Sequence, residues 1–149
     1  MNDFGNGPAR ILLVEDNPGD VRLVQEALNI GKVRHELAVV GDGAEALAFL
    51  RHEPPYADAP RPDLVLLDLH LPRVDGHVVL QAIKADEAMR QIPVVMLTTS
   101  SDHSDIIASY GLRANAVVTK PIDLEQFVAA IHTIEDFWLG IAERPSKRG

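Results

Sequence analysis

The sequence of 149 residues contains no cysteine. This absence excludes disulfide bonds, thiolate metal sites, iron–sulfur clusters and cysteine nucleophiles. The chain also has no apolar run near the roughly 18 residues that a membrane-spanning helix needs, and its start, MNDFGNGP, lacks the basic and apolar regions of a signal peptide. We therefore expect a cytoplasmic protein without a membrane partner.

Basic residues are in the minority, since 14 Lys and Arg stand against 22 Asp and Glu and give a net charge of −8. Binding along a phosphate backbone needs clustered positive charge, so we expect no nucleic-acid partner. Hydrophobic residues make up 46% of the chain and charged residues 24%, which is typical of a globular protein that buries a core. A chain of this length has room for one domain.

Four short apolar runs, each followed by a polar or charged residue, predict the strands of a sheet. They are apolar on both faces and partly β-branched, as is typical of buried strands in a parallel sheet. A fifth strand is predicted at His35–Val40, where the apolar pattern is less continuous and indicates a position near an edge. The four runs cover residues 11–14, 64–67, 94–97 and 116–118.

Segments of helical periodicity separate and follow these strands. The first begins at Asn17-Pro18, where an N-cap residue precedes a proline at the first helical position, and apolar residues then recur at intervals of three and four. Four further helices are predicted at residues 43–50, 76–85, 101–110 and 124–139. Five strands therefore alternate with five helices.

This alternation predicts an α/β fold with a parallel sheet. Five units are too few for a barrel of eight, so we predict a flavodoxin-like open sheet of strand order 2-1-3-4-5 with five helices on both faces. The domain is expected to span residues 10–139, with a flexible N-terminus at 1–9 and a C-terminal tail at 140–149. Ligands of such sheets bind beyond the carboxyl ends of the strands.

Five polar residues stand at those strand ends, namely Glu15, Asp16, Asp68, Thr98 and Lys120. Carboxylates brought together repel, because two unit charges about 4 Å apart cost on the order of 4 kcal/mol at an effective dielectric constant of about 20. We expect Lys120 and a bound Mg²⁺ to compensate, since Mg²⁺ binds few protein carboxylates and completes its shell with water and phosphate oxygens. These groups are the components of phosphoryl transfer, with Asp68 as the candidate nucleophile.

The segments that carry these residues resemble those of the receiver domain of two-component response regulators, in the same order along the chain. They are LLVEDN at 12–17, DLVLLDLHLPRVDG at 63–76, PVVMLTT at 93–99 and VTKP at 118–121. The resemblance covers almost the whole chain. It implies that Asp68 accepts a phosphoryl group from a sensor histidine kinase, and that the protein is a signalling domain rather than an enzyme with a separate substrate.

The resemblance also implies a role for each site residue. Glu15, Asp16 and Asp68 would bind Mg²⁺ together with the backbone carbonyl of His70. Thr98 and Lys120 would contact the phosphoryl group, and the peptide bond from Lys120 to Pro121 would be cis.

Two positions bear on signalling in this family. Val117 stands where the family usually has an aromatic residue whose rotation reports phosphorylation. His70 stands two residues after the phosphoacceptor, where its imidazole would either shield the phosphoryl group or assist an attacking water. The phosphate lifetime and the route of switching are therefore left open by the sequence.

The end of the last predicted helix carries a second apolar cluster at Phe137, Trp138 and Leu139. These side chains either cap the core or form the interface of a homodimer, because aromatic residues are enriched in interface cores. Only ten residues follow Leu139, so we expect a stand-alone receiver that acts through a downstream protein. Its accessory features resemble the small regulators of phytochrome-type histidine kinases.

Two other functions remain open. One is a binding module of the same fold whose output depends on dimer contacts rather than on phosphate. The other is a Mg²⁺-dependent phosphatase for small phosphoesters, but the dehalogenase-like phosphatases carry a second Asp two residues after the nucleophile, where this sequence has His70. No glycine-rich phosphate-binding motif follows a strand, so nucleotide binding has no support.

Overall fold

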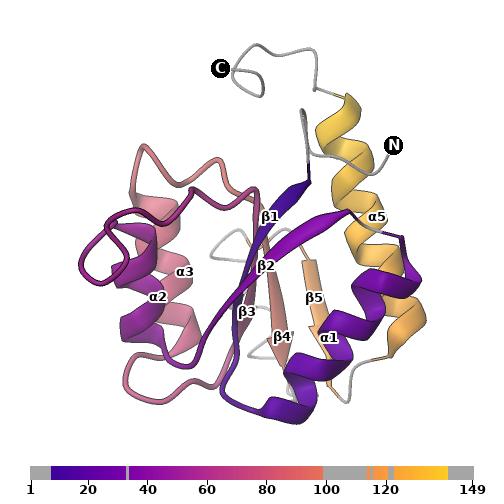
Figure 1. Ribbon diagram of the computed structural model, residues 1–149, viewed down its shortest axis with the longest axis horizontal. Coiled ribbons are helices and arrows are strands. Elements are labelled where there is room, and N and C mark those ends of the chain that lie inside the picture. Colours follow the sequence, from indigo (N-terminus) through magenta and orange to yellow (C-terminus); the bar gives the residue numbers. More distant parts are fainter. Residues whose placement is uncertain (1–7, 33, 99–113, 115, 121–122, 141–149) are drawn as a thin grey trace.

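The computed structural model describes residues 8–32, 34–98, 114, 116–120 and 123–140, with side chains in the last helix described as far as residue 134. Five parallel strands form one sheet in the order β2-β1-β3-β4-β5 (Figure 1). The strands are β1 (Ala9–Val14), β2 (His35–Val40), β3 (Leu64–Asp68), β4 (Val94–Thr98) and β5 (Ala116–Thr119). The predicted strand order is confirmed.

Four helices are described, and they cover both faces of the sheet. They are α1 (Pro18–Ile30), α2 (Gly43–Leu50), α3 (Gly76–Ala85) and α5 (Leu124–Gly140). Helices α1 and α5 lie on one face and α2 and α3 on the other (Figure 1). The helix predicted at 101–110 lies outside the described residues. None of the helices among the described residues is long and apolar enough to cross a membrane.

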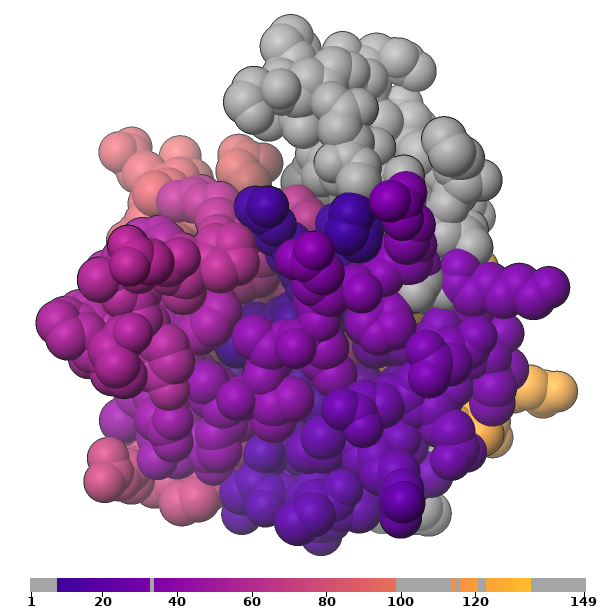
Figure 2. Space-filling model, viewed as in Figure 1, coloured from indigo at the N-terminus to yellow at the C-terminus, as the bar shows by residue number. Residues whose placement is uncertain are grey.

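Two hydrophobic cores follow from the alternation of side chains along each strand. In β1, Ile11 and Leu13 face the α1/α5 side, whereas Leu12 and Val14 face the α2/α3 side. The edge strand β2 lies at the front of the view between α1 and α2, and only Val40 of its six residues is buried (Figures 1 and 2). A sheet covered on both faces explains why β3 and β4 are apolar at every position before their last residue.

Strands β3, β4 and β5 each extend one residue beyond the predicted end. Asp68 pairs with Leu97, and Thr98 pairs with Thr119, so the parallel ladder includes the polar residues that were predicted to follow it. Strand β1 begins two residues earlier than predicted, because the N–H of Ala9 donates to the carbonyl of Arg34 at 2.9 Å. Backbone pairing therefore continues where the apolar pattern ends.

Short polar side chains begin three of the helices. Asn17 caps α1 by accepting from the N–H groups of Gly19 and Asp20, as predicted. Asp42 accepts from the N–H of Glu45 at the start of α2, and Asp75 caps α3 in the same way. Asn17 follows the end of β1 by three residues, and Asp42 follows the end of β2 by two. The first turns of α1 and α2 therefore lie at the carboxyl edge of the sheet.

The loop after β3 is packed tightly against its surroundings. A Cβ atom at Gly76 would lie 2.3 Å from the carbonyl oxygen of Asp68, and one at Gly43 would lie 2.1 Å from the carbonyl oxygen of Val74. Arg73, in the same loop, has a φ of 69° and lies with its Nε 3.6 Å from Asp42 Oδ2. The backbone following Asp68 is thus fixed against the starts of both α2 and α3.

Candidate functional site

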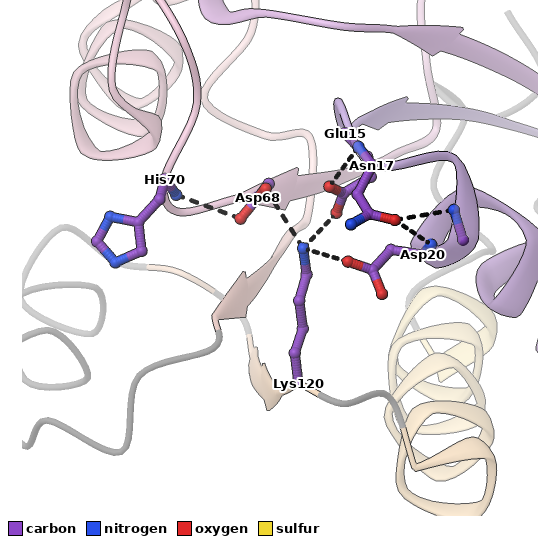
Figure 3. A network of polar contacts seen from close by, with 7 residues as sticks. Glu15, Asn17, Asp20, Asp68, His70 and Lys120 are labelled. Atoms are coloured by element: carbon purple, nitrogen blue, oxygen red, sulfur yellow. Dashed lines mark hydrogen bonds and ion pairs between the residues drawn. The ribbon is translucent and has the colours of Figure 1, made fainter.

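A polar cluster occupies the carboxyl ends of β1, β3 and β5, at the edge of the sheet where the sequence predicted it (Figure 3). Among the described residues, the buried polar and charged ones are Glu15, Asp68, Thr98 and Lys120. All four are predicted site residues. Burial of charge is costly unless the charges are paired, and the three charged residues are buried where Lys120 pairs with both Glu15 and Asp68.

Glu15 is held in place by its own backbone and by that of the following turn. Its N–H donates to the carbonyl of Val40 at 3.0 Å, and its Oε2 accepts from the N–H of Asn17 at 3.1 Å. Its other oxygen, Oε1, lies 2.6 Å from Lys120 Nζ. One carboxylate oxygen therefore accepts a backbone hydrogen bond, and the other forms an ion pair with Lys120.

Asp68 ends β3 with its carboxylate 7% exposed. Its Oδ1 accepts from the backbone N–H of His70 at 3.2 Å, and its Oδ2 lies 3.3 Å from Lys120 Nζ. A hydrogen-bond donor and a cation thus flank the carboxylate, and both are groups that stabilise developing negative charge.

Lys120 is the positive centre of the cluster. Its ammonium contacts three carboxylates, at 2.6 Å from Glu15, 2.9 Å from Asp20 and 3.3 Å from Asp68. The backbone N–H of Lys120 donates to the carbonyl of Thr98, which ties β5 to β4 at this point. The contact with Asp20 was not predicted. Asp20 lies six residues beyond the end of β1 at Val14. The signal that could have found it is its place in the first turn of a helix that begins at this edge.

The carboxylate oxygens of Glu15, Asp16 and Asp68 lie within 4.8 Å of one another. Asp16 is exposed, whereas the other two are buried. Among the described residues the cluster holds four carboxylates, counting Asp20, and one ammonium, so it keeps an excess of negative charge. Hard oxygen ligands and excess negative charge are the chemistry that a divalent cation such as Mg²⁺ requires, and the three residues fit the predicted metal site.

The environment shifts the pKa values of the two most buried groups. Burial raises the pKa of Glu15 to about 7. The contact with Lys120 lowers this pKa, and the negative charge of Asp68 raises it. Burial alone would lower the pKa of Lys120, but its contacts with Glu15 and Asp20 hold that pKa above its usual range. The lysine is therefore charged, and a further cation in the cluster would favour the ionised form of Glu15.

Other predicted features are only partly described. Thr98 is buried at the end of β4, and Val117 is partly buried against the α2/α3 core. The proposed roles of the Thr98 hydroxyl and the His70 carbonyl stay predictions. The peptide bond to Pro121 lies outside the described residues, as do the side chains of Phe137, Trp138 and Leu139 in α5.

The chain is similar to proteins of known sequence along almost its whole length. The family profile of the response regulator receiver domain matches residues 11–132. The response regulator Rcp1 of Synechocystis sp. (strain ATCC 27184 / PCC 6803 / Kazusa) is 46% identical over 146 residues, which make up 98% of this chain and 99% of Rcp1.

Solved structures agree with these sequence matches. The phosphorylated cyanobacterial phytochrome response regulator RcpA superposes with a TM-score of 0.77 at 50% identity, covering 89% of this chain and 95% of the RcpA chain. The Mn²⁺-bound form of Rcp1 gives a TM-score of 0.76 at 48% identity with the same coverage. The fold, the cluster at the strand ends and the family profile agree, and the chain belongs to the response regulator receiver domain family.

Proposed function

We propose that the chain is a response regulator in which Asp68 accepts a phosphoryl group from the phosphohistidine of a sensor histidine kinase. The observation that carries the proposal is the cluster itself, in which the Asp68 carboxylate lies beside Lys120 and within 4.8 Å of two further carboxylates. The phosphorylated form of RcpA, a relative at 50% identity, supports it.

Glu15, Asp16 and Asp68, with the backbone carbonyl of His70, are the proposed ligands of Mg²⁺. The Mn²⁺-bound form of the related Rcp1 supports the binding of a divalent cation. When bound, the ion supplies positive charge that offsets the carboxylates and the oxygens of the transferred group.

In the proposed reaction, a carboxylate oxygen of Asp68 forms a bond to phosphorus while the bond between phosphorus and the kinase imidazole nitrogen breaks. The electron pair of the broken bond returns to the imidazole. Lys120 pairs with one phosphoryl oxygen and the Thr98 hydroxyl donates to another, so that charge is neutralised as it develops. Beyond its own phosphorylation and dephosphorylation, we propose no enzymatic activity.

The partner kinase is proposed to be of the phytochrome type, and the site of action to be the cytoplasm. RcpA is named as a phytochrome response regulator, and Rcp1 matches this chain over nearly the full length of both. We propose that a receiver domain at residues 10–139 passes the signal to a downstream protein. A homodimer through Phe137, Trp138 and Leu139 is likewise a proposal, which rests on three large apolar residues in succession.

Phosphotransfer from a purified phytochrome-type histidine kinase tests the assignment of Asp68. We expect the wild type to acquire label from a radioactive phospho-kinase, and both Asp68→Asn and addition of EDTA to abolish labelling. Asp58→Asn, which changes an exposed carboxylate outside the cluster, is the matched control and should be labelled normally. Acid-labile phosphate on the Asp68→Asn protein would refute the proposal.

A further inference from the structure

Asp20 belongs to the polar cluster, but the proposed chemistry does not use it. It lies in the first turn of α1, where its backbone N–H donates to Asn17 Oδ1 at 3.1 Å. Its Oδ2 lies 2.9 Å from Lys120 Nζ, whereas the nearest oxygen of Asp68 lies 3.3 Å from the same atom. The lysine is thus held more closely by a carboxylate that is not the proposed phosphoacceptor.

The ammonium of Lys120 is shared among three carboxylates in this arrangement. It carries three N–H groups and contacts three carboxylates, and Asp20 and Asp68 approach it from different sides (Figure 3). A phosphoryl oxygen that approaches Lys120 therefore competes with these three carboxylates for the same ammonium.

The three contacts differ in how easily they break. The carboxylate of Glu15 is fully buried and its contact is the shortest, so its separation from Lys120 would leave a buried charge unpaired. The carboxylate of Asp20 is 19% exposed, and water can solvate it when the lysine leaves. The contact with Asp20 is therefore the one expected to yield.

We infer that Asp20 is a positioning residue that competes with the phosphoryl group for Lys120 and so weakens the phosphorylated state relative to the resting state. The inference rests on the proposed function of Asp68. A contact that is present only in the resting state lowers the free energy of that state, and so it shifts the equilibrium away from the phosphorylated state. In this way Asp20 biases the protein toward rest.

The affinity for beryllofluoride, an analogue of the phosphoryl group, measures this competition at saturating Mg²⁺. We expect Asp20→Asn to bind beryllofluoride about two to five times more tightly than the wild type, which is the range for the loss of one partly exposed ion pair. Asp20→Glu, which keeps the charge, should restore an affinity near that of the wild type. Mg²⁺ affinity is measured separately for each variant, so that every protein is compared with its metal site filled.

Glu26→Gln is the matched control, because it removes one negative charge from an exposed position on the same helix. It should leave the beryllofluoride affinity unchanged. If Asp20 only stabilised the fold, Asp20→Asn would lower the thermal midpoint without raising the affinity, and that result would overturn the inference.

A second measurement uses the metal-free protein. A carboxylate contact slows the exchange of ammonium protons with water, so Asp20→Asn should speed the exchange of the Lys120 ammonium in ¹⁵N NMR spectra several-fold. Unchanged exchange would contradict the inference independently of phosphate chemistry.

The two proposals fail in different ways. Beryllofluoride binding to the wild type should be lost in Asp68→Asn. If the wild type does not bind it, or if binding persists in Asp68→Asn, the proposed function is wrong and the inference is wrong with it. If Asp68-dependent binding is present but Asp20→Asn leaves it unchanged or weaker, only the inference is wrong.

Discussion

At the scale of single residues, Glu15 shows most directly how burial and charge oppose each other. Its carboxylate is fully buried, and burial raises its pKa to about 7 even though Lys120 lies 2.6 Å away. A carboxyl group whose pKa rises on folding binds its proton more tightly in the folded state. The stability gained from that proton is present at low pH and is lost as the pH rises through the folded pKa.

Glu15→Gln removes this pH dependence. In the metal-free protein, we expect the free energy of unfolding of the wild type to fall relative to that of the variant as the pH rises from 4.5 to about 7, by up to about 3 kcal/mol. Urea denaturation in EDTA at a series of pH values measures the difference. Parallel pH profiles for the two proteins would contradict the burial argument.

The sequence predicted the residues of the site well where the site follows from strand ends. Carboxyl ends of neighbouring parallel strands lie at one edge of the sheet, so Glu15, Asp68 and Lys120 could be brought together without knowledge of the structure. Asp20 could not, because its contact depends on how the first turn of α1 is rotated toward β5. That rotation is set by the packing of α1 against the sheet and α5, which residue spacing does not encode.

At the scale of elements, the close contact between α2 and the loop after β3 determines how the backbone beyond Asp68 is held. Gly43 begins α2 and faces the Val74 carbonyl at a distance that leaves no space for a side chain. The ion pair between Arg73 and Asp42 joins the same two segments. The nearest atom to a Cβ at Gly43 is the backbone oxygen of Val74, and a backbone atom cannot move aside as the end of a flexible side chain can.

Gly43→Ala should therefore destabilise the protein, by about 2–3 kcal/mol, because its Cβ would lie 2.1 Å from a backbone oxygen. Thermal denaturation of the variant and the wild type gives the difference. Gly41→Ala is the control, since the nearest atom to its Cβ is a side-chain oxygen of Glu45 at 3.9 Å, and it should change stability far less. Equal effects of the two substitutions would show that the loop yields to the added methyl group.

The sequence predicted every described helix and strand, with differences confined to the ends. Apolar patterning ends at Leu67 and Leu97, but hydrogen bonding in a parallel ladder includes the next residue on each strand. The close packing of the loop after β3 against α2 was not predicted. The positive φ of Arg73 and the approach of Val74 to Gly43 arise from contacts between segments about 30 residues apart.

At the scale of the whole molecule, metal binding should increase the free energy of unfolding. A ligand that binds only the folded state at about one hundred times its dissociation constant adds about 2.7 kcal/mol. We expect Mg²⁺ to raise the thermal midpoint of the wild type. Because Asp16 is exposed, Asp16→Asn should leave the metal-free midpoint nearly unchanged and abolish the increase.

Calorimetry with EDTA or with Mg²⁺ measures both quantities. Asp58→Asn, an exposed substitution away from the cluster, should keep the full increase. An increase that persists in Asp16→Asn would place the ion elsewhere on the surface.

The strand order has a consequence for folding. Glu15 and Lys120 are 105 positions apart in the chain, and β1 and β5 are separated in the sheet by β3 and β4. Contacts between distant positions form slowly, since the intervening chain must first be ordered. An intermediate that lacks β5 would hold the carboxylates of β1 and β3 without their lysine, and their repulsion would oppose its accumulation. Docking of β5 therefore completes the sheet and the polar cluster in one step.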